Sequence, residues 1–205
     1  MAEEPLEKPV SDGLVRCHDD VYGSPMHTAY HDIYWGTPTR NEQRLFEFLS
    51  LSGMQAGLSW WGVWRRRDAF RAAFDDFDPL LVARYGDDKV AELLADRGII
   101  RNRAKIRCII GNARAVCGLR PEFEGLADYL WSFVDGRPRM NRWPRGMQVP
   151  AVAPPAEEIS ADMKRRGFGF CGPIITYAYI QSVGLVNDHR DGCFKQTALP
   201  FDYSR

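Results

Sequence analysis

Apolar and polar residues follow one another with the spacing of α-helices along most of the chain. Thr39 and Glu42 have the T-x-x-E spacing of a capping box, and apolar residues then recur at helical intervals from Leu45 to Leu51. We therefore predict a helix that begins near Thr39 and buries this apolar side.

Further segments show helical spacing or helix start signals. Ser59 is an N-cap candidate, and Asp78 followed by Pro79 is typical of an N-cap and the first helical position. No segment alternates as a half-buried strand does, so the predicted fold class is all-α, with many short helices. The predicted helices cover residues 60–74, 87–98, 102–117, 126–134, 157–166 and 173–183, with a short one from 79.

Two stretches lack a helical period. Residues 1–15 are acidic and polar and are predicted to form a disordered tail. Residues 136–156 are rich in proline and arginine and are predicted to form a long loop. We expect a single domain over 16–205, which can divide into two lobes, one of about 45–120 and one of 16–44 plus 121–205.

The composition is that of an ordinary globular protein. The chain has 205 residues, 45% of them hydrophobic, and its 27 Lys and Arg balance its 27 Asp and Glu. No apolar run approaches the roughly 20 residues that a membrane span needs. The polar start of the chain does not resemble an export signal, so we expect a cytoplasmic protein whose five cysteines are reduced thiols or metal ligands.

Basic residues are grouped, although the net charge is zero. Runs of arginine and lysine occupy 65–67 and 164–166, and five basic residues lie within 101–114 without an acid. Such groups indicate a nucleic-acid-binding face, or else they are the solvated faces of helices, and charge alone favours the second interpretation.

Two pairs of soft ligands lie near opposite ends of the chain. Cys17 precedes His31, and His189 precedes Cys193 by about one helical turn. Two cysteines and two histidines form a common closed zinc set, which would join two chain ends that have little apolar area. The pairing can also be coincidence, because other candidate ligands are present, namely His18, His27, Cys108, Cys117 and Cys171.

Two other groups of residues suggest binding. Gly167–Gly172 reads G-F-G-F-C-G between a basic helix end and an apolar helix, and the glycines at its two ends are expected to take positive φ. This layout is typical of a hairpin whose amides hold a DNA phosphate, or of an ordinary corner between helices. An aromatic group can form a stacking pocket or part of the core. Its members are Tyr30, Tyr34, Trp35, Trp60, Trp61 and Trp64.

Several ordered motifs together resemble one family, the type I DNA-3-methyladenine glycosylases of the helix-hairpin-helix superfamily. The resemblance runs from about Cys17 to Cys193. The motifs are A-Y-H-D at 29–32, Y-W-G at 34–36, Q-A-G-L-S-W at 55–60, F-D-P at 77–79, G-I-I-R at 98–101, I-I-G-N-A-R at 109–114, W-S-F-V at 131–134, K-R-R-G-F at 164–168 and G-L-V-N-D-H at 184–189.

This resemblance implies specific roles for the residues singled out above. It implies an all-α glycosylase fold in which one structural Zn²⁺, held by Cys17, His31, His189 and Cys193, joins the two ends. It also implies a DNA-binding hairpin and a base pocket. The DNA-binding residues would be Lys164, Arg165, Arg166, Gly167, Gly169 and Gly172, and the base-binding residues Tyr30, Trp35, Ser52 and Trp60.

The resemblance also bears on the reaction. Bifunctional relatives carry a lysine two residues after the last hairpin glycine, where this chain has Ile174, so a monofunctional enzyme is implied. Many relatives carry a catalytic aspartate where the type I family has asparagine, here Asn187. No strong general base can be named, since Asp188 lies between residues linked to the zinc set.

One departure from the family concerns the base pocket. The family has a glutamate that hydrogen-bonds the alkylated adenine, and this chain has Ser52 there, with Met54 in place of a glutamine. A hydroxyl is a weaker partner for a cationic base than a carboxylate.

The sequence therefore predicts a monomeric, nucleoid-associated DNA glycosylase that flips out and hydrolytically releases alkylated purines from double-stranded DNA. Two alternatives stay open, a non-catalytic protein that binds alkylated DNA and a glycosylase for a bulkier adduct. All three share the predicted fold and DNA-binding surface.

Overall fold

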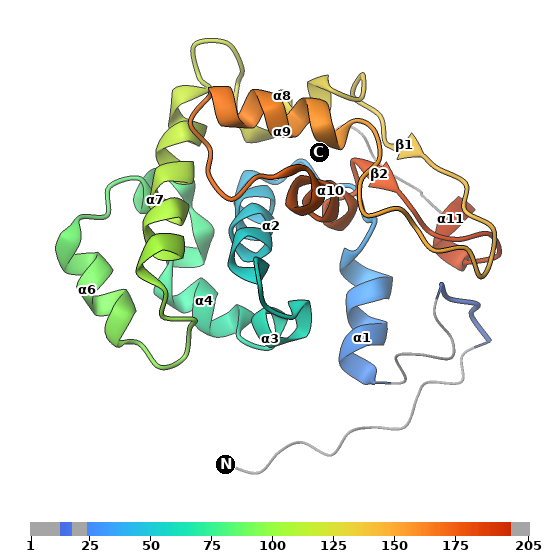
Figure 1. Ribbon diagram of the computed structural model, residues 1–205, viewed down its shortest axis with the longest axis horizontal. Helices are drawn as coiled ribbons and strands as arrows, with labels where there is room; N and C mark the ends of the chain where they lie inside the picture. Colours follow the sequence, from blue (N-terminus) through green and yellow to red (C-terminus); the bar gives the residue numbers. More distant parts are fainter. Residues whose placement is uncertain (1–12, 18–23, 198–205) are drawn as a thin grey trace.

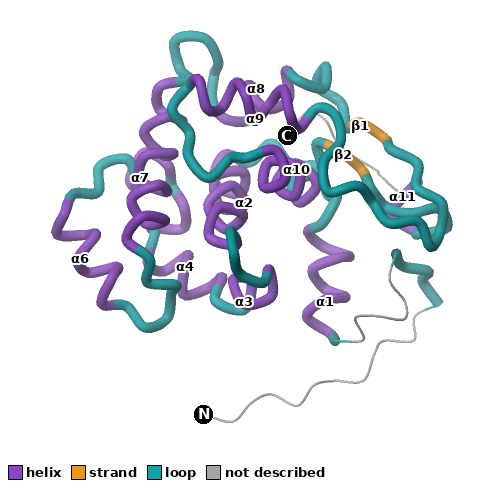
Figure 2. The backbone as a smooth tube through the Cα atoms, viewed as in Figure 1, coloured by secondary structure: helices purple, strands orange, loops and turns teal. Residues whose placement is uncertain are grey.

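The computed structural model describes residues 13–17 and 24–197, and these are mostly helical (Figures 1 and 2). The two strands are β1 (Arg139–Met140) and β2 (Val186–Asn187). The helical elements are α1 (Pro25–Ala29), η1 (Tyr30–Tyr34), α2 (Glu42–Gln55), α3 (Trp60–Trp64), α4 (Arg67–Ala73), η2 (Asp75–Phe77), α5 (Pro79–Val82), α6 (Asp87–Ala95), α7 (Arg103–Gly118), α8 (Leu126–Ser132), α9 (Ala156–Arg165), α10 (Pro173–Ser182) and α11 (Phe194–Thr197).

Helix α2 lies at the centre of the fold, between α7 on one side and α10 on the other (Figure 1). Its side chains from Leu45 to Ser52 are all buried, so it is covered on every side and not on one stripe alone. The hydroxyl of Tyr179 in α10 donates to the carbonyl oxygen of Leu45 at 3.0 Å, which ties the two helices together.

The start of α2 differs from the predicted capping box. Asn41 is the N-cap, and its side-chain oxygen accepts from the amide of Arg44 at 2.8 Å. The carboxylate of Glu42 does not bond to the backbone of its own helix. It accepts instead from the amides of Leu126 and Ala127 at the start of α8. Glu42 thus caps a helix 84 residues further along the chain.

The helix predicted over 60–74 is two helices. Ser59 caps α3 as expected, but Arg66 has a non-helical backbone, with φ −100° and ψ 11°, and α4 begins after it. The turn after α4 holds three left-handed residues in succession, Asp75, Asp76 and Phe77. Asp78 then caps α5 through the amide of Leu80, also as expected.

The other predicted helices are confirmed within a few residues, and Asn102 caps α7 through the amide of Lys105. The short elements α1, η1 and α11 were not predicted. Neither was the parallel pairing of β1 with β2, in which Arg139 faces Val186, because two-residue strands are too short to alternate. This pairing holds the long loop against the segment after α10.

The two ends of the described chain lie side by side, since the amide of Phe194 donates to the carbonyl oxygen of Val15 at 2.9 Å. Most of the predicted tail, residues 1–15, lies outside the described residues. Within the described part, no helix combines the length and apolar character needed to cross a membrane.

Candidate functional site

The predicted hairpin begins with a regular helix ending. After α9, Gly167 takes a positive φ of 87°, and its amide donates to the carbonyl of Lys164. The amide of Phe168 reaches back to the carbonyl of Met163 at 3.0 Å, which completes a Schellman motif. The chain then turns toward α10, which packs closely against α9.

The middle of the hairpin is fixed by helix α7. The side chain of Asn112 accepts from the amide of Gly169 at 2.7 Å and donates to its carbonyl at 3.2 Å. The hydroxyls of Ser160 and Thr176 both donate to the carbonyl of Cys171. The loop is therefore held on both sides of Phe170.

The glycines of the hairpin do not share one role, contrary to the expectation that those at both ends take positive φ. Gly172 has φ −61° and is the N-cap of α10, a conformation open to any residue. The second left-handed position belongs to Phe170, with φ 48°. An added Cβ on Gly172 would meet no atom within 4 Å, so the space beside the amides of α10 is open.

The basic run at the end of α9 is only partly available for binding. Lys164 and Arg165 are exposed, and Arg165 pairs with Asp162 at 2.6 Å. Arg166 instead pairs with both Asp162 and Glu122, and its guanidinium lies over the rings of nearby aromatic residues. Arg166 therefore has a structural role in addition to any contact with a phosphate.

The aromatic group is brought together beside α2. The ring of Tyr30 lies 5.4 Å from that of Trp60 and 4.8 Å from that of Trp64, between centroids. The hydroxyl of Tyr30 hydrogen-bonds with Ser182 at 3.0 Å, and burial raises the pKa of Tyr30. Tyr30 stays a neutral phenol under physiological conditions.

Ser52 lies at this aromatic group. It is one helical turn from Phe48 on α2, and the ring of Phe48 stacks on that of Trp60, 6.4 Å between centroids. Ser52 is 1% exposed. Among the described residues, neither the Ser52 hydroxyl nor the Nε1 atom of Trp60 has a hydrogen-bond partner, although both atoms are buried.

Trp35, the fourth predicted base-binding residue, lies against a different group. Its ring packs edge-on to that of His189, 4.6 Å between centroids, and near that of His31. Its carbonyl accepts from Nε2 of His189 and from the ammonium of Lys195. The structure thus brings Tyr30 and Trp60 together, and Ser52 lies one helical turn from a ring that stacks on Trp60. Trp35 is joined to the predicted metal ligands.

A buried ion cluster behind the aromatic group was not predicted. Both oxygens of Glu47 accept from Arg67 at 2.6 and 2.9 Å, and both also accept from Arg71. Burial acts to raise the pKa of Glu47, but the bonds from the two arginines outweigh it, so that pKa is lowered. The Arg67 guanidinium also lies over the rings of Tyr34 and Trp64.

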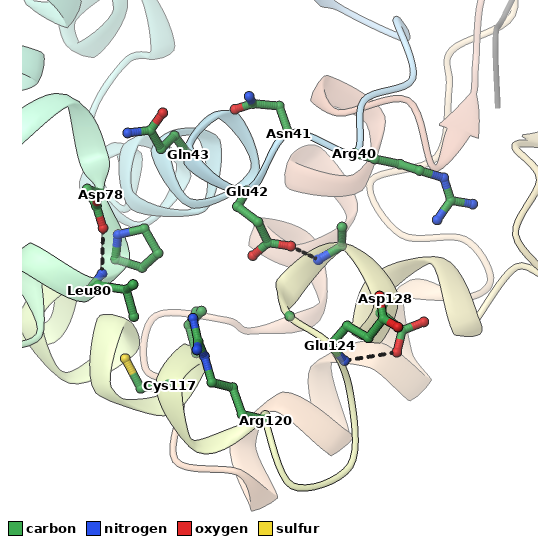
Figure 3. Close-up of a pocket in the computed structure, with 14 residues that line it drawn as sticks. Arg40, Asn41, Glu42, Gln43, Asp78, Leu80, Cys117, Arg120, Glu124 and Asp128 are labelled. Carbon is green, nitrogen blue, oxygen red and sulfur yellow. Dashed lines mark hydrogen bonds between the residues drawn. The ribbon is translucent and has the colours of Figure 1, made fainter. Parts of the chain in front are cut away.

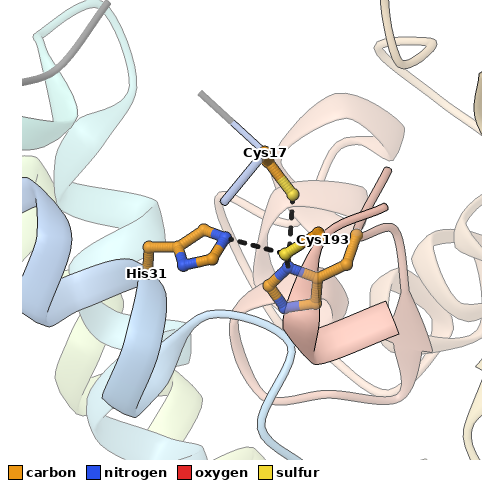
Figure 4. A group of neighbouring side chains, drawn as sticks. Cys17, His31 and Cys193 are labelled. Carbon is orange, nitrogen blue, oxygen red and sulfur yellow. Dashed lines mark hydrogen bonds between the residues drawn. The ribbon is translucent and has the colours of Figure 1, made fainter. Parts of the chain in front are cut away.

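The four predicted metal ligands converge from the two ends of the described chain (Figure 4). Their ligand atoms all lie within 4.8 Å of one another. The sulfur atoms of Cys17 and Cys193 are 3.3 and 3.4 Å from Nδ1 of His189, and the sulfur of Cys193 is 3.5 Å from Nε2 of His31. Sulfur and nitrogen ligands of one tetrahedral zinc are roughly 3.5 Å apart, so this set fits that ion.

The groups around these ligands also suit a metal. Nδ1 of His31 lies 2.7 Å from Asp32, which Arg16 holds through two nitrogens, so Nε2 is left to face the centre. The pKa of the Cys193 thiol lies far below its usual range, because Cys17 and the two histidines hydrogen-bond to the thiolate.

The reason for the spacing of His189 and Cys193 differs from the prediction. They are not on a helix, and a turn with Gly192 at φ 84° brings them together. Of the alternative ligands, Cys108 and Cys171 lie at the hairpin, and His27 stacks on Trp61. His18 lies outside the described residues.

The two polar residues before His189 have structural partners. Asn187 accepts from the amide of His189 and donates to the carbonyl of Lys195. The carboxylate of Asp188 accepts hydrogen bonds from four side chains and is 1% exposed. These are Asn141, Trp143, Tyr177 and Gln181. Neither residue reaches the aromatic group through a described contact.

A surface pocket of about 680 Å³ lies elsewhere, between the start of α2, α5 and the end of α7 (Figure 3). Three of its four carboxylates are engaged in local structure, since Glu42 caps α8, Asp78 caps α5 and Asp128 accepts from the amide of Glu124. None of the predicted site residues lines it.

Comparison with known proteins bears directly on this arrangement. The methyladenine glycosylase family profile matches residues 20–196. The chain is 43% identical to DNA-3-methyladenine glycosylase 1 of Escherichia coli (strain K12) over 173 residues, which are 84% of this chain and 92% of that protein.

Solved structures agree. A crystal structure of 3-methyladenine DNA glycosylase I superposes with a TM-score of 0.82 at 43% identity, over 88% of this chain and 98% of the other. The Staphylococcus aureus 3-methyladenine DNA glycosylase I, solved to explain its recognition of 3-methyladenine, superposes with a TM-score of 0.83 at 28% identity, over 89% and 98%.

The fold and the extent of these matches define a DNA glycosylase. Within that class, the chain belongs to the methyladenine glycosylase family. This confirms the family expected from the sequence motifs and the mostly helical fold.

Proposed function

We propose that this protein is a monofunctional DNA N-glycosylase that flips alkylated purines out of double-stranded DNA and releases them by hydrolysis. The observation that carries the proposal is the pair of unpartnered polar atoms, the Ser52 hydroxyl and Nε1 of Trp60, at the aromatic group. A buried polar atom without a partner costs free energy, so such atoms indicate a bound ligand. A flat base with polar edges supplies both stacking and hydrogen bonds.

The reaction needs little acid catalysis. A purine alkylated on a ring nitrogen is cationic, so it leaves readily with the electrons of the N-glycosidic bond while water adds to the sugar. Trp60 and Tyr30 would stack on the flipped base and keep solvent from it. Ile174 is 63% exposed at the start of α10 and has no amine, so no Schiff base can form there.

The hairpin would hold the DNA backbone. In this helix-hairpin-helix arrangement, the space where a side chain on Gly172 would lie is open at the start of α10, and Lys164 and Arg165 are exposed at the end of α9. Backbone amides and cations at a helix start favour a phosphate. We further propose that the protein acts as a monomer at the cytoplasmic nucleoid, where its substrate lies.

One Zn²⁺ would be held by Cys17, His31, His189 and Cys193. The four ligands fill a tetrahedral shell, so the ion would have a structural role and no open position for substrate. It would join the segment around Cys17 to the end of the described chain. Without the ion, the described contacts between these two segments include a backbone hydrogen bond between Val15 and Phe194 and the guanidinium of Arg16 over the ring of Phe194.

Ser52 favours a second candidate, a glycosylase of the same chemistry with a different preferred base. Glu47 lies five residues before Ser52 on α2, but two arginines neutralise its carboxylate. The described contacts therefore give the aromatic group no free carboxylate to hold a cationic purine. Loss of charge and of side-chain volume at Ser52 suits a larger or less polar adduct.

Chromatography of bases released from DNA tests the proposal. DNA treated with a methylating agent and DNA treated with a bulky alkylating agent are incubated with the protein. Free 3-methyladenine supports the first candidate, and release of a bulky adduct alone supports the second. Binding of damaged duplex without any released base would contradict both.

A further inference from the structure

The two phenylalanines of the hairpin have opposite environments. Phe168 is 4% exposed and its ring is parallel to that of Tyr129 in the core. Phe170, two residues later, is 38% exposed and has no place in that core. A large exposed aromatic side chain on a rigid loop is unusual enough to suggest a binding role.

The backbone at Phe170 is also unfavourable for its side chain. Its φ of 48° lies in the left-handed region, where a bulky residue is strained and glycine is not. Three of the six residues from Gly167 to Gly172 are glycines, yet this position is a phenylalanine. Strain at a well-held position of a binding loop is a common sign of function.

The position of Phe170 links the two parts of the proposed site. The loop is held by hydrogen bonds on either side of Phe170. The side chain of Asn112 accepts from the amide of Gly169, and two hydroxyls donate to the carbonyl of Cys171. On α2, a Cβ added to Gly53 would lie 3.4 Å from Cβ of Phe170. Phe170 thus lies against the residue next to Ser52, two residues before the N-cap of α10.

We propose that Phe170 contacts DNA at the lesion, where its ring stacks on a base left exposed when the damaged nucleotide leaves the duplex. This inference rests on the proposed function, because it takes the hairpin as the surface that holds the backbone. A ring next to both the proposed phosphate contacts and Ser52 would face the interior of the duplex. Stacking on one base changes affinity by roughly ten-fold or more, and any base offers a suitable face.

The test compares binding to two duplexes of one sequence, one undamaged and one with a tetrahydrofuran abasic analogue, at fixed salt. Phe170→Gly removes the ring and suits the left-handed backbone, so its melting temperature should be unchanged or higher. We expect it to lose about ten-fold affinity for the abasic duplex and less than two-fold for the undamaged one. Phe170→Trp should keep the preference for abasic DNA.

A control variant and a fluorescence measurement test the role of the Phe170 ring separately from general binding. Leu81→Ala removes another exposed apolar side chain, on α5 and outside the hairpin, and should leave the preference for abasic DNA unchanged. With 2-aminopurine opposite the abasic analogue, the wild-type protein should quench its fluorescence and Phe170→Gly should not.

Equal losses on both duplexes, or no loss on either, would overturn the role of Phe170. If the wild-type protein prefers abasic DNA through Phe170 but releases no base, the proposed enzymatic function fails and this inference stands. If the wild-type protein binds neither duplex, both fail.

Discussion

The ammonium nitrogen of Lys105 lies 2.8 Å from the carbonyl oxygen of Met54, at the end of the helix that carries Ser52. It also donates to the carbonyl of Ala56 at 2.6 Å, and its side chain is buried. The last carbonyls of a helix need donors, and a cation suits the negative end of the helix dipole. Lys105 thus connects α7 to the turn that leads from the end of α2 to α3.

Lys105→Met should therefore leave those carbonyls without a partner in the interior. We expect a loss of about 1–3 kcal/mol in the free energy of unfolding, measured with urea. Faster amide exchange in residues 55–59 than in α7 would show that the effect is local. Lys89→Met, at a half-buried lysine on α6 that pairs with the exposed Glu92, is the control and should change stability little. Equal stability of the two variants would contradict the assignment.

Glu47 makes stability depend on pH in a defined direction. Its pKa is lowered in the folded protein from an ordinary value of 4.5, by the bonds from Arg67 and Arg71 against the effect of burial. The contribution of ionised Glu47 to the free energy of unfolding is therefore complete above about pH 5, and it is lost as the pH falls through the folded-state pKa. Urea unfolding at pH 7, 5, 4 and 3 should show this decline.

Glu47→Gln should remove most of that pH dependence and lower stability at pH 7 by about 3–5 kcal/mol, because Arg67 stays buried without its carboxylate. Glu92→Gln is the control, since Glu92 is exposed and pairs with Lys89 on the surface. A pH profile of Glu47→Gln that matches the wild-type profile would show that the ion cluster does not contribute as described.

The Cys and His cluster predicts a metal content. Elemental analysis of freshly purified protein should find one zinc per chain. Cys193→Ala should lose that zinc and lower the melting temperature by more than about 5 °C, because a closed site stabilises the fold. Cys117→Ala, a cysteine outside the cluster, should keep both zinc and stability. Metal-free wild-type protein of full stability would contradict this prediction.

The hairpin predicts sequence-independent binding to DNA. Gly172→Val should fold, since the backbone there suits any residue and a Cβ meets no atom, but the side chain would stand in front of the α10 amides. Affinity for damaged and undamaged duplex should fall by a similar factor of about ten, with a shallower dependence on salt.

Gly86→Val is a matched control for that experiment, because Gly86 is also an N-cap glycine with open space around it, on the distant helix α6. Its DNA affinity should equal that of the wild-type protein. A loss confined to damaged duplex in Gly172→Val would show that the hairpin does not hold phosphates.

Local signals were the most predictable part of the structure. Ser59 and Asp78 cap the helices that follow them as expected, because an N-cap bonds to amides two or three residues away. The predicted capping box of Thr39 and Glu42 was wrong, because the partner of Glu42 is not local. Its carboxylate found amides at the start of α8, and that choice depends on packing that no local pattern encodes.

The candidate site likewise combines residues that local motifs identify with residues whose roles depend on packing. Tyr30, Trp60 and the four Cys and His ligands were found through motifs, and the structure brings each group together. The sequence shows Glu47 only as an acid within an apolar run. Its ion pair could not be predicted, because its partner Arg67 is 20 residues away. The strain at Phe170 was hidden because neighbouring glycines were expected to take the left-handed positions.

Ser52→Glu tests which base the pocket accepts. Ser52 is buried without a described partner, so a carboxylate there would lower stability of the free protein but could bond the donor edge of a cationic alkyladenine. A charge-assisted bond contributes about 1.5–3 kcal/mol against about 0.5–1.5 for a hydroxyl, so release of 3-methyladenine from methylated DNA should rise about ten-fold. Ser52→Gln has the same size without the charge and should not match this gain. If Ser52→Glu folds, binds DNA normally and releases no more 3-methyladenine than the wild-type protein, the pocket is built for a different base.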